Sequence, residues 1–254
     1  RKAVRIVARA STIIGNGHRI RNGKDPLKTK KEHTIAQNFL YLINGEEPDA
    51  ETAHVLDSSL TLYAEHGFNA STFACRVTVA TLSDIYSGIV TGIGTLRGPL
   101  HGGANEEAMK MILAIGSPDK AEAWIRDALA TKKKIMGFGH REYKKRDPRA
   151  IYMTKVGKEL CEKKGQTQWS KIADILERVM ETEKGIYPNV DFPAAYAYYV
   201  LGFPIDLYTP IFVMARVSGW SAHVLEQLAH NRLIRPACIY EGPRTAVWVP
   251  VEER

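Results

Sequence analysis

Four short segments of the sequence combine residues that can transfer protons with residues that shape tight turns. They are EHGFN (65–69), GPLHGGAN (98–105), GFGH (137–140) and YPNVD (187–191). Histidine can donate or accept a proton near neutral pH, and an adjacent glycine lets backbone and ligand approach closely. Because catalytic groups often lie in loops held by rigid elements, these segments supply the candidate functional residues.

Each histidine also has a structural explanation. His66 follows a predicted helix, where an imidazole often only caps the last carbonyls, so both interpretations stay open for it. His101 and His140 stand beside glycine in apolar surroundings, which favours a functional role. The other histidines are interpreted as surface or packing residues: His18, His33, His54, His223 and His230.

A basic stretch surrounds the third segment. Residues 132–149 contain eight Lys or Arg residues against Glu142 and Asp147. Such a run is usually a solvated face, but here it brackets a glycine-rich turn, where backbone N–H groups and cations could together hold phosphates. A nucleic-acid-binding patch has a similar composition, so the run alone does not choose between these ligands.

Several common kinds of site are excluded. The sequence contains no HExxH, GxSxG, Walker A or strand-associated GxGxxG motif, and no acid is placed to complete a zinc site with His223 and His230. Cys75 stands in an apolar helical context, where an inert buried thiol is expected. We therefore predict neither a metal site nor a nucleophilic cysteine.

Composition describes an ordinary soluble protein of 254 residues with 44% hydrophobic residues. Three cysteines without CxxC spacing fit a reducing compartment, so a cytoplasmic location is expected. No segment is long and apolar enough to predict a membrane span or a signal peptide, and the longest apolar stretch, residues 71–96, is interpreted as a buried core helix. A net charge of +7 favours anionic partners without identifying them.

The elements that must position the four segments are predicted to be helices. Helical spacing of apolar residues covers residues 35–43, and capping signals open further helices at Asp49, Ser117 and Asp147. In the helix after Asp147, residues Ile151, Val156 and Leu160 are expected to face inward. Another helix is expected over about 210–229. Only the tail looks strand-like, with residues 237–240 and 245–251 forming a small hairpin around Glu241-Gly242-Pro243.

The segments, taken in order, resemble the citrate synthase family, which includes the 2-methylcitrate synthases. The resemblance runs from about Arg19 to the C-terminus and rests on GPLHGGAN, on GFGH followed by DPR, and on PNVD, ARVSGW and IRP. The family has a further N-terminal helical segment. Because the sequence opens at Arg1 without methionine, directly in a helical pattern, we expect that an N-terminal portion is missing.

The resemblance implies a role for each matching residue. His101 would hydrogen-bond the thioester carbonyl as it becomes an enolate, Asp191 would remove the methyl proton, and His140 would protonate the new alkoxide. The oxo acid's carboxylates would be held by His66, Arg149 and Arg216, together with Arg235 from a neighbouring subunit. CoA would be recognised by the turn Ile135, Met136, Gly137, Phe138 and Gly139, and by Lys144, which stands where some relatives have arginine.

The implied fold is all-α with two domains. We expect a large domain from residues 1–102 and 207–254, a small domain from residues 103–206, a hinge at Gly102-Gly103, and a homodimer. The implied reaction joins acetyl-CoA, as a substrate and without any cofactor, to oxaloacetate. A 2-methylcitrate synthase using propionyl-CoA, a nucleic-acid-binding helical protein and a catalytically silent homologue are the alternatives.

Overall fold

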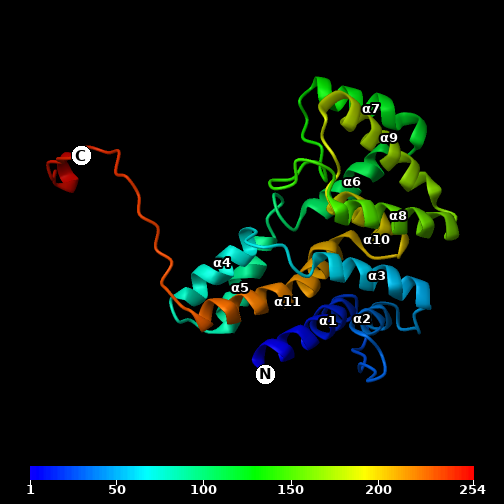
Figure 1. Cartoon of the computed structure of the whole chain (residues 1–254), viewed down its shortest axis with the longest axis horizontal. Coiled ribbons are helices and arrows are strands. Elements are labelled where there is room, and N and C mark those ends of the chain that lie inside the picture. The colour runs from blue at the N-terminus through cyan, green and yellow to red at the C-terminus, as the bar shows by residue number, and fades with distance from the viewer.

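The computed structural model describes all residues 1–254, and its regular elements are helices only (Figure 1). Eleven α-helices and two short 3-10 helices follow one another along the chain: α1 Lys2–Arg21, α2 Ile35–Asn44, α3 Ala50–Tyr63, α4 Ala70–Ala80, α5 Ile85–Leu96, α6 Ala104–Ile115, α7 Pro118–Ala130, α8 Pro148–Lys163, α9 Thr167–Lys184, α10 Asp191–Val200, η1 Ile205–Leu207, α11 Tyr208–Ala229 and η2 Val251–Glu253. The prediction of an all-α protein is confirmed.

The helix boundaries follow the capping chemistry of the sequence. Thr34 and Gln37 form a reciprocal capping box that starts α2, and Gly45 ends that helix in the left-handed conformation. The side chains of Asp49 and Asp147 accept backbone N–H groups at the starts of α3 and α8. Ser117 precedes α7 as expected, but its hydroxyl makes no capping hydrogen bond.

The apolar stretch 71–96 forms two helices, so the prediction of one core helix was wrong. Helix α4 ends at Ala80, where Leu82 takes the positive φ of 66° that an interior helical residue never adopts. Asp84 then caps α5 through the backbone N–H groups of Tyr86 and Ser87. The two helices pack against each other as an antiparallel pair joined by this turn (Figure 1).

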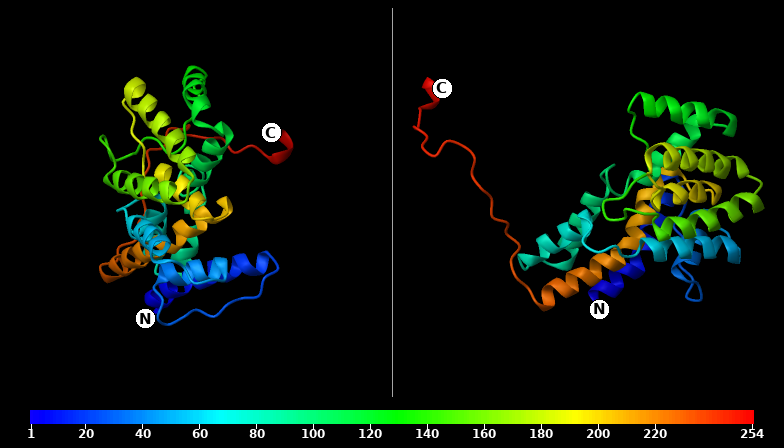
Figure 2. Two further views of the ribbon diagram at one scale, coloured as in Figure 1. Left: turned by 90° about the vertical axis from the view of Figure 1, so that its right-hand side faces the viewer. Right: turned by 45° about the horizontal axis from the view of Figure 1, so that its top comes forward.

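The helices form two neighbouring groups (Figures 1 and 2). Helices α6 to α10 lie together, with α10 packed on α6 and α8 and with α7 packed on α9. Helix α11 lies along α1, α3, α4 and α5 in the other group. One continuous core of 52 buried residues extends through both groups. The candidate functional segments lie in the loops between these helices.

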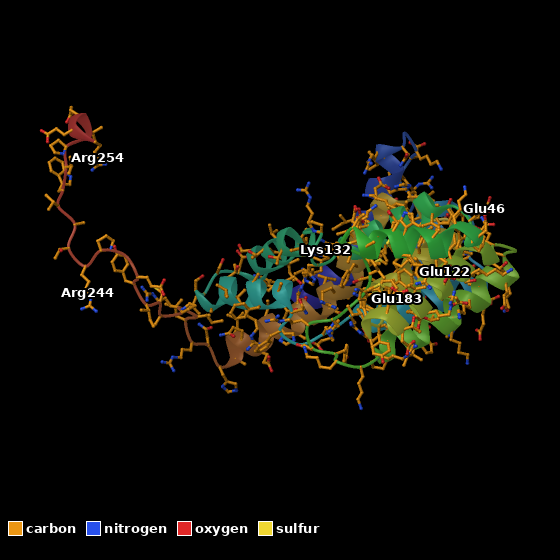
Figure 3. All side chains as sticks on the ribbon, turned by 90° about the horizontal axis from the view of Figure 1, so that it is seen from above. Glu46, Glu122, Lys132, Glu183, Arg244 and Arg254 are labelled. Atoms are coloured by element: carbon orange, nitrogen blue, oxygen red, sulfur yellow. The ribbon has the colours of Figure 1, made fainter.

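The expected C-terminal hairpin does not form. Residues 230–250 run away from the helical body as an irregular segment, as Figure 3 shows around Arg244, and only η2 is regular near Arg254. Tyr240, Val247 and Trp248 are exposed, Trp248 by 75%. A two-stranded hairpin is only marginally stable unless one face packs on a core, and nothing in this chain covers these apolar side chains.

A second correction concerns α8. Val156 and Leu160 are buried, as predicted, but Ile151 is 55% exposed. It stands on the outer side of the first turn, while Ala150 and Met153 face the core. None of the helices is long and apolar enough to cross a membrane.

Candidate active site

A cavity of about 420 Å³ brings the four segments together where the two helix groups meet. Its walls come from the loop after α3, the turn before α6, the 139–142 segment and the first turns of α8 and α10, with α11 behind them. The lining residues are His66, Phe68, Asn69, Ala70, Leu100, His101, Ala104, Gly139, His140, Arg141, Glu142, Arg149, Asn189, Val190, Asp191, Phe212 and Arg216.

His101 is held from the side of α4. Its Nε2 atom lies 2.8 Å from the hydroxyl of Ser71 and 3.4 Å from the backbone N–H of Ser71. The same hydroxyl accepts a hydrogen bond from Trp220 Nε1 and lies 2.9 Å from Asn69 Oδ1. Because the backbone N–H of Ser71 makes Nε2 of His101 an acceptor, the proton of the neutral imidazole is on Nδ1. Burial, aided by the charge of Arg216, lowers the pKa of His101 to about 4. The imidazole is therefore neutral at pH 7 and fixed in direction.

His140 and His66 are in contact with each other in the cavity wall. Their Nε2 atoms are 3.1 Å apart, and Nδ1 of His140 accepts the backbone N–H groups of Glu142 and Tyr143. Because Nδ1 is an acceptor, the proton of neutral His140 is on Nε2, and His66 Nε2 must accept it. Burial, followed by the charge of Arg149, lowers the pKa of both imidazoles. His140 thus carries an N–H donor at the cavity wall, and in this structure His66 accepts it.

Asp191 is the first residue of α10. Its Oδ1 accepts a 2.7 Å hydrogen bond from the Tyr63 hydroxyl. The Asn189 side chain accepts the backbone N–H of Asp191 and donates to the carbonyl of Gly139, so one amide ties the 187–191 turn to the segment that carries His140. Burial raises the pKa of Asp191 to about 6, although the hydrogen bond from Tyr63 and the charge of Arg149 oppose the increase. The result is a carboxylate more basic than usual.

Two arginines supply positive charge beside these groups. Arg149 forms a two-point ion pair with Asp147, with a 2.8 Å contact from Nη2 to Oδ2. Arg216 is only 1% exposed, and its Nε donates to the carbonyl of Tyr63 at 2.7 Å. Its Nη1 is buried without any partner. Burial, with the charge of Arg149, lowers the pKa of Arg216 to about 10, so it stays charged at neutral pH. Arg149 and Arg216 both line the cavity, and their guanidinium groups fit an anionic ligand there.

The segment predicted to contact CoA is a short extended stretch beside this cavity. Asn189 N–H donates to the Gly137 carbonyl and Gly139 N–H donates to the Tyr187 carbonyl, which pairs Phe138 with Pro188 as an isolated bridge. Gly137 has a φ of +81°, and a Cβ atom there would lie 2.8 Å from Phe192. Ile135 is buried and Met136 is partly buried. A second cavity of about 180 Å³, bordered by Lys144 and Lys145, adjoins this stretch.

The structure brings His66, His101, His140, Asp191, Arg149 and Arg216 around one cavity. It does not bring Arg235 there, because that residue lies in the segment that leaves the body after α11. Sequence reasoning missed Tyr63, Ser71 and Asn189. Ser71 and Asn189 stand inside or beside the motifs, but Tyr63 looks like any apolar position of a helix, so no sequence signal could have identified it.

Comparison with known proteins agrees with this geometry. The family described as "Citrate synthase, C-terminal domain" matches residues 1–237. Over the whole chain, 49% of residues are identical to Citrate synthase 2 of Bacillus subtilis, of which the chain covers 68%. Identity is 44% to 2-methylcitrate synthase 2 of Corynebacterium glutamicum, with 98% of this chain and 66% of that protein covered.

Solved structures give the same result. The Thermoplasma acidophilum citrate synthase, in a ternary complex with carboxymethyl coenzyme A and oxaloacetate, superposes with a TM-score of 0.93 at 38% identity, covering 99% of this chain and 68% of that one. The chain thus spans about two thirds of the length of these relatives. With its fold, its cavity and its sequence in agreement, the chain belongs to the citrate synthase family.

Proposed function

We propose that the protein condenses acetyl-CoA with oxaloacetate and water to give citrate and CoA. The observation that carries this proposal is the convergence of Asp191, His101 and His140 on one cavity that Arg149 and Arg216 also line. The reaction needs a base, two neutral hydrogen-bond donors and a site for a dicarboxylate, and these are the groups present.

The first step forms the enolate. Asp191 takes a proton from the methyl group of acetyl-CoA, and the electron pair moves to the thioester oxygen. His101 stabilises that oxygen by a hydrogen bond from Nδ1, with Nε2 directed to Ser71. In a closed site, each donor already directed at the developing charge stabilises the transition state by roughly 3 kcal/mol. A neutral imidazole suits this role because it donates the hydrogen bond without a positive charge, which would make the nearby Asp191 carboxylate less basic.

The second step makes the carbon–carbon bond. The enolate carbon attacks the oxo carbon of oxaloacetate, and Nε2–H of His140 donates its proton to the oxygen that becomes the alkoxide. The backbone N–H groups of Glu142 and Tyr143 support this role because they keep the proton on Nε2. Water then hydrolyses the resulting citryl thioester and releases the CoA thiol. The proton that Asp191 took returns through water to Nε2 of His140, so both groups regain their starting states.

Oxaloacetate would be held by His66, Arg149 and Arg216. Planar guanidinium groups grip carboxylates at two points, which fixes the oxo carbon for attack. The CoA moiety would lie along Ile135 to Gly139, and Gly139 borders the second cavity together with Lys144. Closure of residues 103–206 as a small domain over the rest, about a hinge at Gly102-Gly103, would exclude water before the enolate forms.

A homodimer would complete the site, with Arg235 entering from the partner. The α4–α5 pair supports self-association because its two helices and the turn between them expose several large apolar side chains: Phe73, Leu82, Tyr86, Val90 and Ile93. Such a concentration on a soluble protein marks an interaction surface. The irregular tail after α11 has no covering in its own chain, which fits a segment that packs on a neighbour.

Propionyl-CoA is the alternative acyl donor, because relatives named 2-methylcitrate synthase are 44–46% identical to this chain. The two donors differ by one methylene, which a pocket distinguishes by only about 1–3 kcal/mol.

The test is release of free CoA thiol from acetyl-CoA, and in parallel from propionyl-CoA, with and without oxaloacetate. We expect oxaloacetate-dependent release with the higher kcat/KM for acetyl-CoA. A higher value for propionyl-CoA would assign the protein as a 2-methylcitrate synthase. No release from the folded protein would contradict the proposed activity.

A further inference from the structure

A polar cluster outside the cavity connects α4 and α11 to the loop that carries His66. It consists of Glu65, Arg76, His223 and Glu226, and we call it the α4–α11 cluster. Nε2 of His223 lies 2.8 Å from Glu65 Oε1, and Arg76 Nη1 lies 3.1 Å from Nδ1 of the same imidazole. Arg76 also pairs with Glu226. None of these four residues lines the cavity.

The cluster fixes the tautomer of His223. A guanidinium group can only donate hydrogen bonds, so Nδ1 of His223 accepts from Arg76 and the ring proton is on Nε2. That proton is donated to Glu65. The charged groups around His223 are Glu65, Arg76 and Glu226, the last with Oε2 at 3.5 Å from Nδ1. The imidazole therefore links Arg76 to Glu65 in a defined direction.

Glu65 connects His223 to the backbone of the loop that carries His66. The carboxylate oxygen that accepts from His223 also accepts the backbone N–H of Gly67 at 2.6 Å. These two hydrogen bonds close a turn around His66, the residue between them. Gly67 has a φ of +56°, the left-handed conformation that this turn requires and that glycine adopts without strain.

The same cluster also holds Phe68, which does line the cavity. The guanidinium carbon of Arg76 lies 4.5 Å from the centre of the Phe68 ring, and the ring of His223 meets it edge-on at 5.4 Å. Phe68 is otherwise exposed. The cluster therefore contacts the loop before Gly67, where His223 binds Glu65, and after it, where Arg76 and His223 pack on Phe68.

We propose that His223, oriented by Arg76, is a positioning residue that sets His66 for binding of the oxo acid by hydrogen-bonding Glu65. This role rests on the proposed function, because it concerns the carboxylate site of the same cavity. The position of a binding group strongly affects catalysis, since a displacement of about 1 Å can reduce the reaction rate on the order of 100-fold. The effect of losing His223 should therefore fall on oxaloacetate and spare the acyl-CoA.

The experiment compares two substitutions at one position. In His223→Gln the side-chain amide reaches the place of Nε2 and can still donate to Glu65, whereas in His223→Asn the shorter amide reaches only the place of Nδ1. His54→Asn is the matched control, because His54 lies within α3, is exposed and makes no side-chain hydrogen bond. All three variants replace a helical histidine by an amide.

We expect His223→Asn to raise the KM for oxaloacetate about tenfold. The kcat and the KM for acetyl-CoA should change by less than about twofold, and His223→Gln should restore most of the oxaloacetate affinity. An unchanged KM for oxaloacetate in His223→Asn would overturn the proposal. Equal losses in the Asn and Gln variants together with a lower Tm would also overturn it, because they would indicate a general structural role.

A second readout needs no turnover. The imidazole proton resonances of His66 report its titration, and burial, followed by the charges of Arg149 and His140, lowers its pKa. In His223→Asn the pKa of His66 should rise toward the ordinary value of 6.5 as the loop loosens. An unchanged titration would contradict the positioning role, whereas absence of turnover in the wild-type protein would contradict the proposed function only.

Discussion

Burial of Asp191 has opposite consequences for chemistry and for stability. A carboxylate whose pKa is raised to about 6 is a better base toward a weakly acidic methyl group than one at 3.8. The same shift means that the folded protein binds the proton more tightly than the unfolded chain. The stabilisation from this group is therefore fully present below pH 3.8 and is lost as the pH rises through about 6.

Replacement of Asp191 by Asn should separate these two effects. The amide oxygen can still accept from Tyr63, so the fold should persist, while turnover should fall by at least about 100-fold because the base is gone. Calorimetry at pH 7.5 should show a Tm equal to or above that of the wild type, since no buried charge remains. A variant that keeps nearly full turnover would show that Asp191 is not the base.

The pH dependence of the wild-type protein follows from the same shift. Because the ionised form of Asp191 is the active one, kcat/KM should decrease as the pH falls below about 6. Initial-rate measurements between pH 5 and 8, in which thiol release is followed at low acetyl-CoA, would check this. A flat profile across that range would mean that another group limits the reaction.

Ser71 offers a test of how His101 is oriented. Ser71→Ala removes the hydroxyl that contacts Nε2 of His101 and also leaves Trp220 Nε1 without its acceptor, at a cost of about 1–3 kcal/mol. We expect kcat to fall about tenfold, with the KM for oxaloacetate unchanged, because Ser71 makes no hydrogen bond to the residues proposed to hold oxaloacetate. Steady-state kinetics with urea unfolding would measure both effects. An unchanged kcat would exclude an orienting role of this hydroxyl.

At the scale of elements, α11 organises the end of α3. Two of its groups donate to the last carbonyls of that helix: Arg216 Nε to Tyr63 O and Gly219 N–H to Ala64 O. The Ser218 hydroxyl, which donates to Ala215 O at 2.7 Å, lies 3.4 Å from Ala64 O. These carbonyls have no partner within α3 itself. The ARVSGW motif therefore joins two helices, and His223 extends the contact to Glu65.

The close approach between α11 and the C-terminal end of α3 depends on Gly219. A Cβ atom there would lie 2.4 Å from Ala64 O, so Gly219→Ala must push the two backbones apart. Overpacking of this kind typically costs about 1–3 kcal/mol, and we expect a matching decrease in the free energy of unfolding. Gly17→Ala within α1 is the control, because nothing lies within 4 Å of its Cβ and alanine favours a helix by roughly 1 kcal/mol. Urea unfolding of both variants should shift in opposite directions.

The elements differed in how far the sequence could predict them. Helices α2, α7 and α8 begin at the predicted positions, because caps and apolar spacing are local signals. The turn at Leu82 could not be predicted, since an apolar residue with positive φ carries no such signal. The tail hairpin failed because β-prone residues form strands only where a partner covers them. Six of the seven residues predicted for catalysis and oxaloacetate line one cavity, but their orienting partners Tyr63 and Ser71 depend on tertiary packing.

At the scale of the whole molecule, the chain alone leaves its site incomplete under the proposed function. Its cavity holds Arg149 and Arg216 for two carboxylates, and the third predicted arginine, Arg235, lies on the tail that leaves the body. The tail carries exposed Trp248 and Val247, and the α4–α5 pair exposes Val90 by 67%. Both surfaces would be covered if two copies exchanged their tails around a two-fold axis.

This assembly can be tested by mixing two inactive variants. Asp191→Asn lacks the base of its own cavity, and Arg235→Ala lacks the arginine that is given to the neighbour. In a mixed dimer, one site receives both defects and the other receives none, because Asp191 of the second subunit meets Arg235 of the first. Random reassociation gives mixed dimers half of the time, so activity should recover to about a quarter of the wild-type value. The variants would be mixed after mild denaturation and assayed for thiol release beside each variant alone. If Arg235 instead served the cavity of its own chain, both sites of every mixed dimer would be defective, and activity would stay at the level of the separate variants.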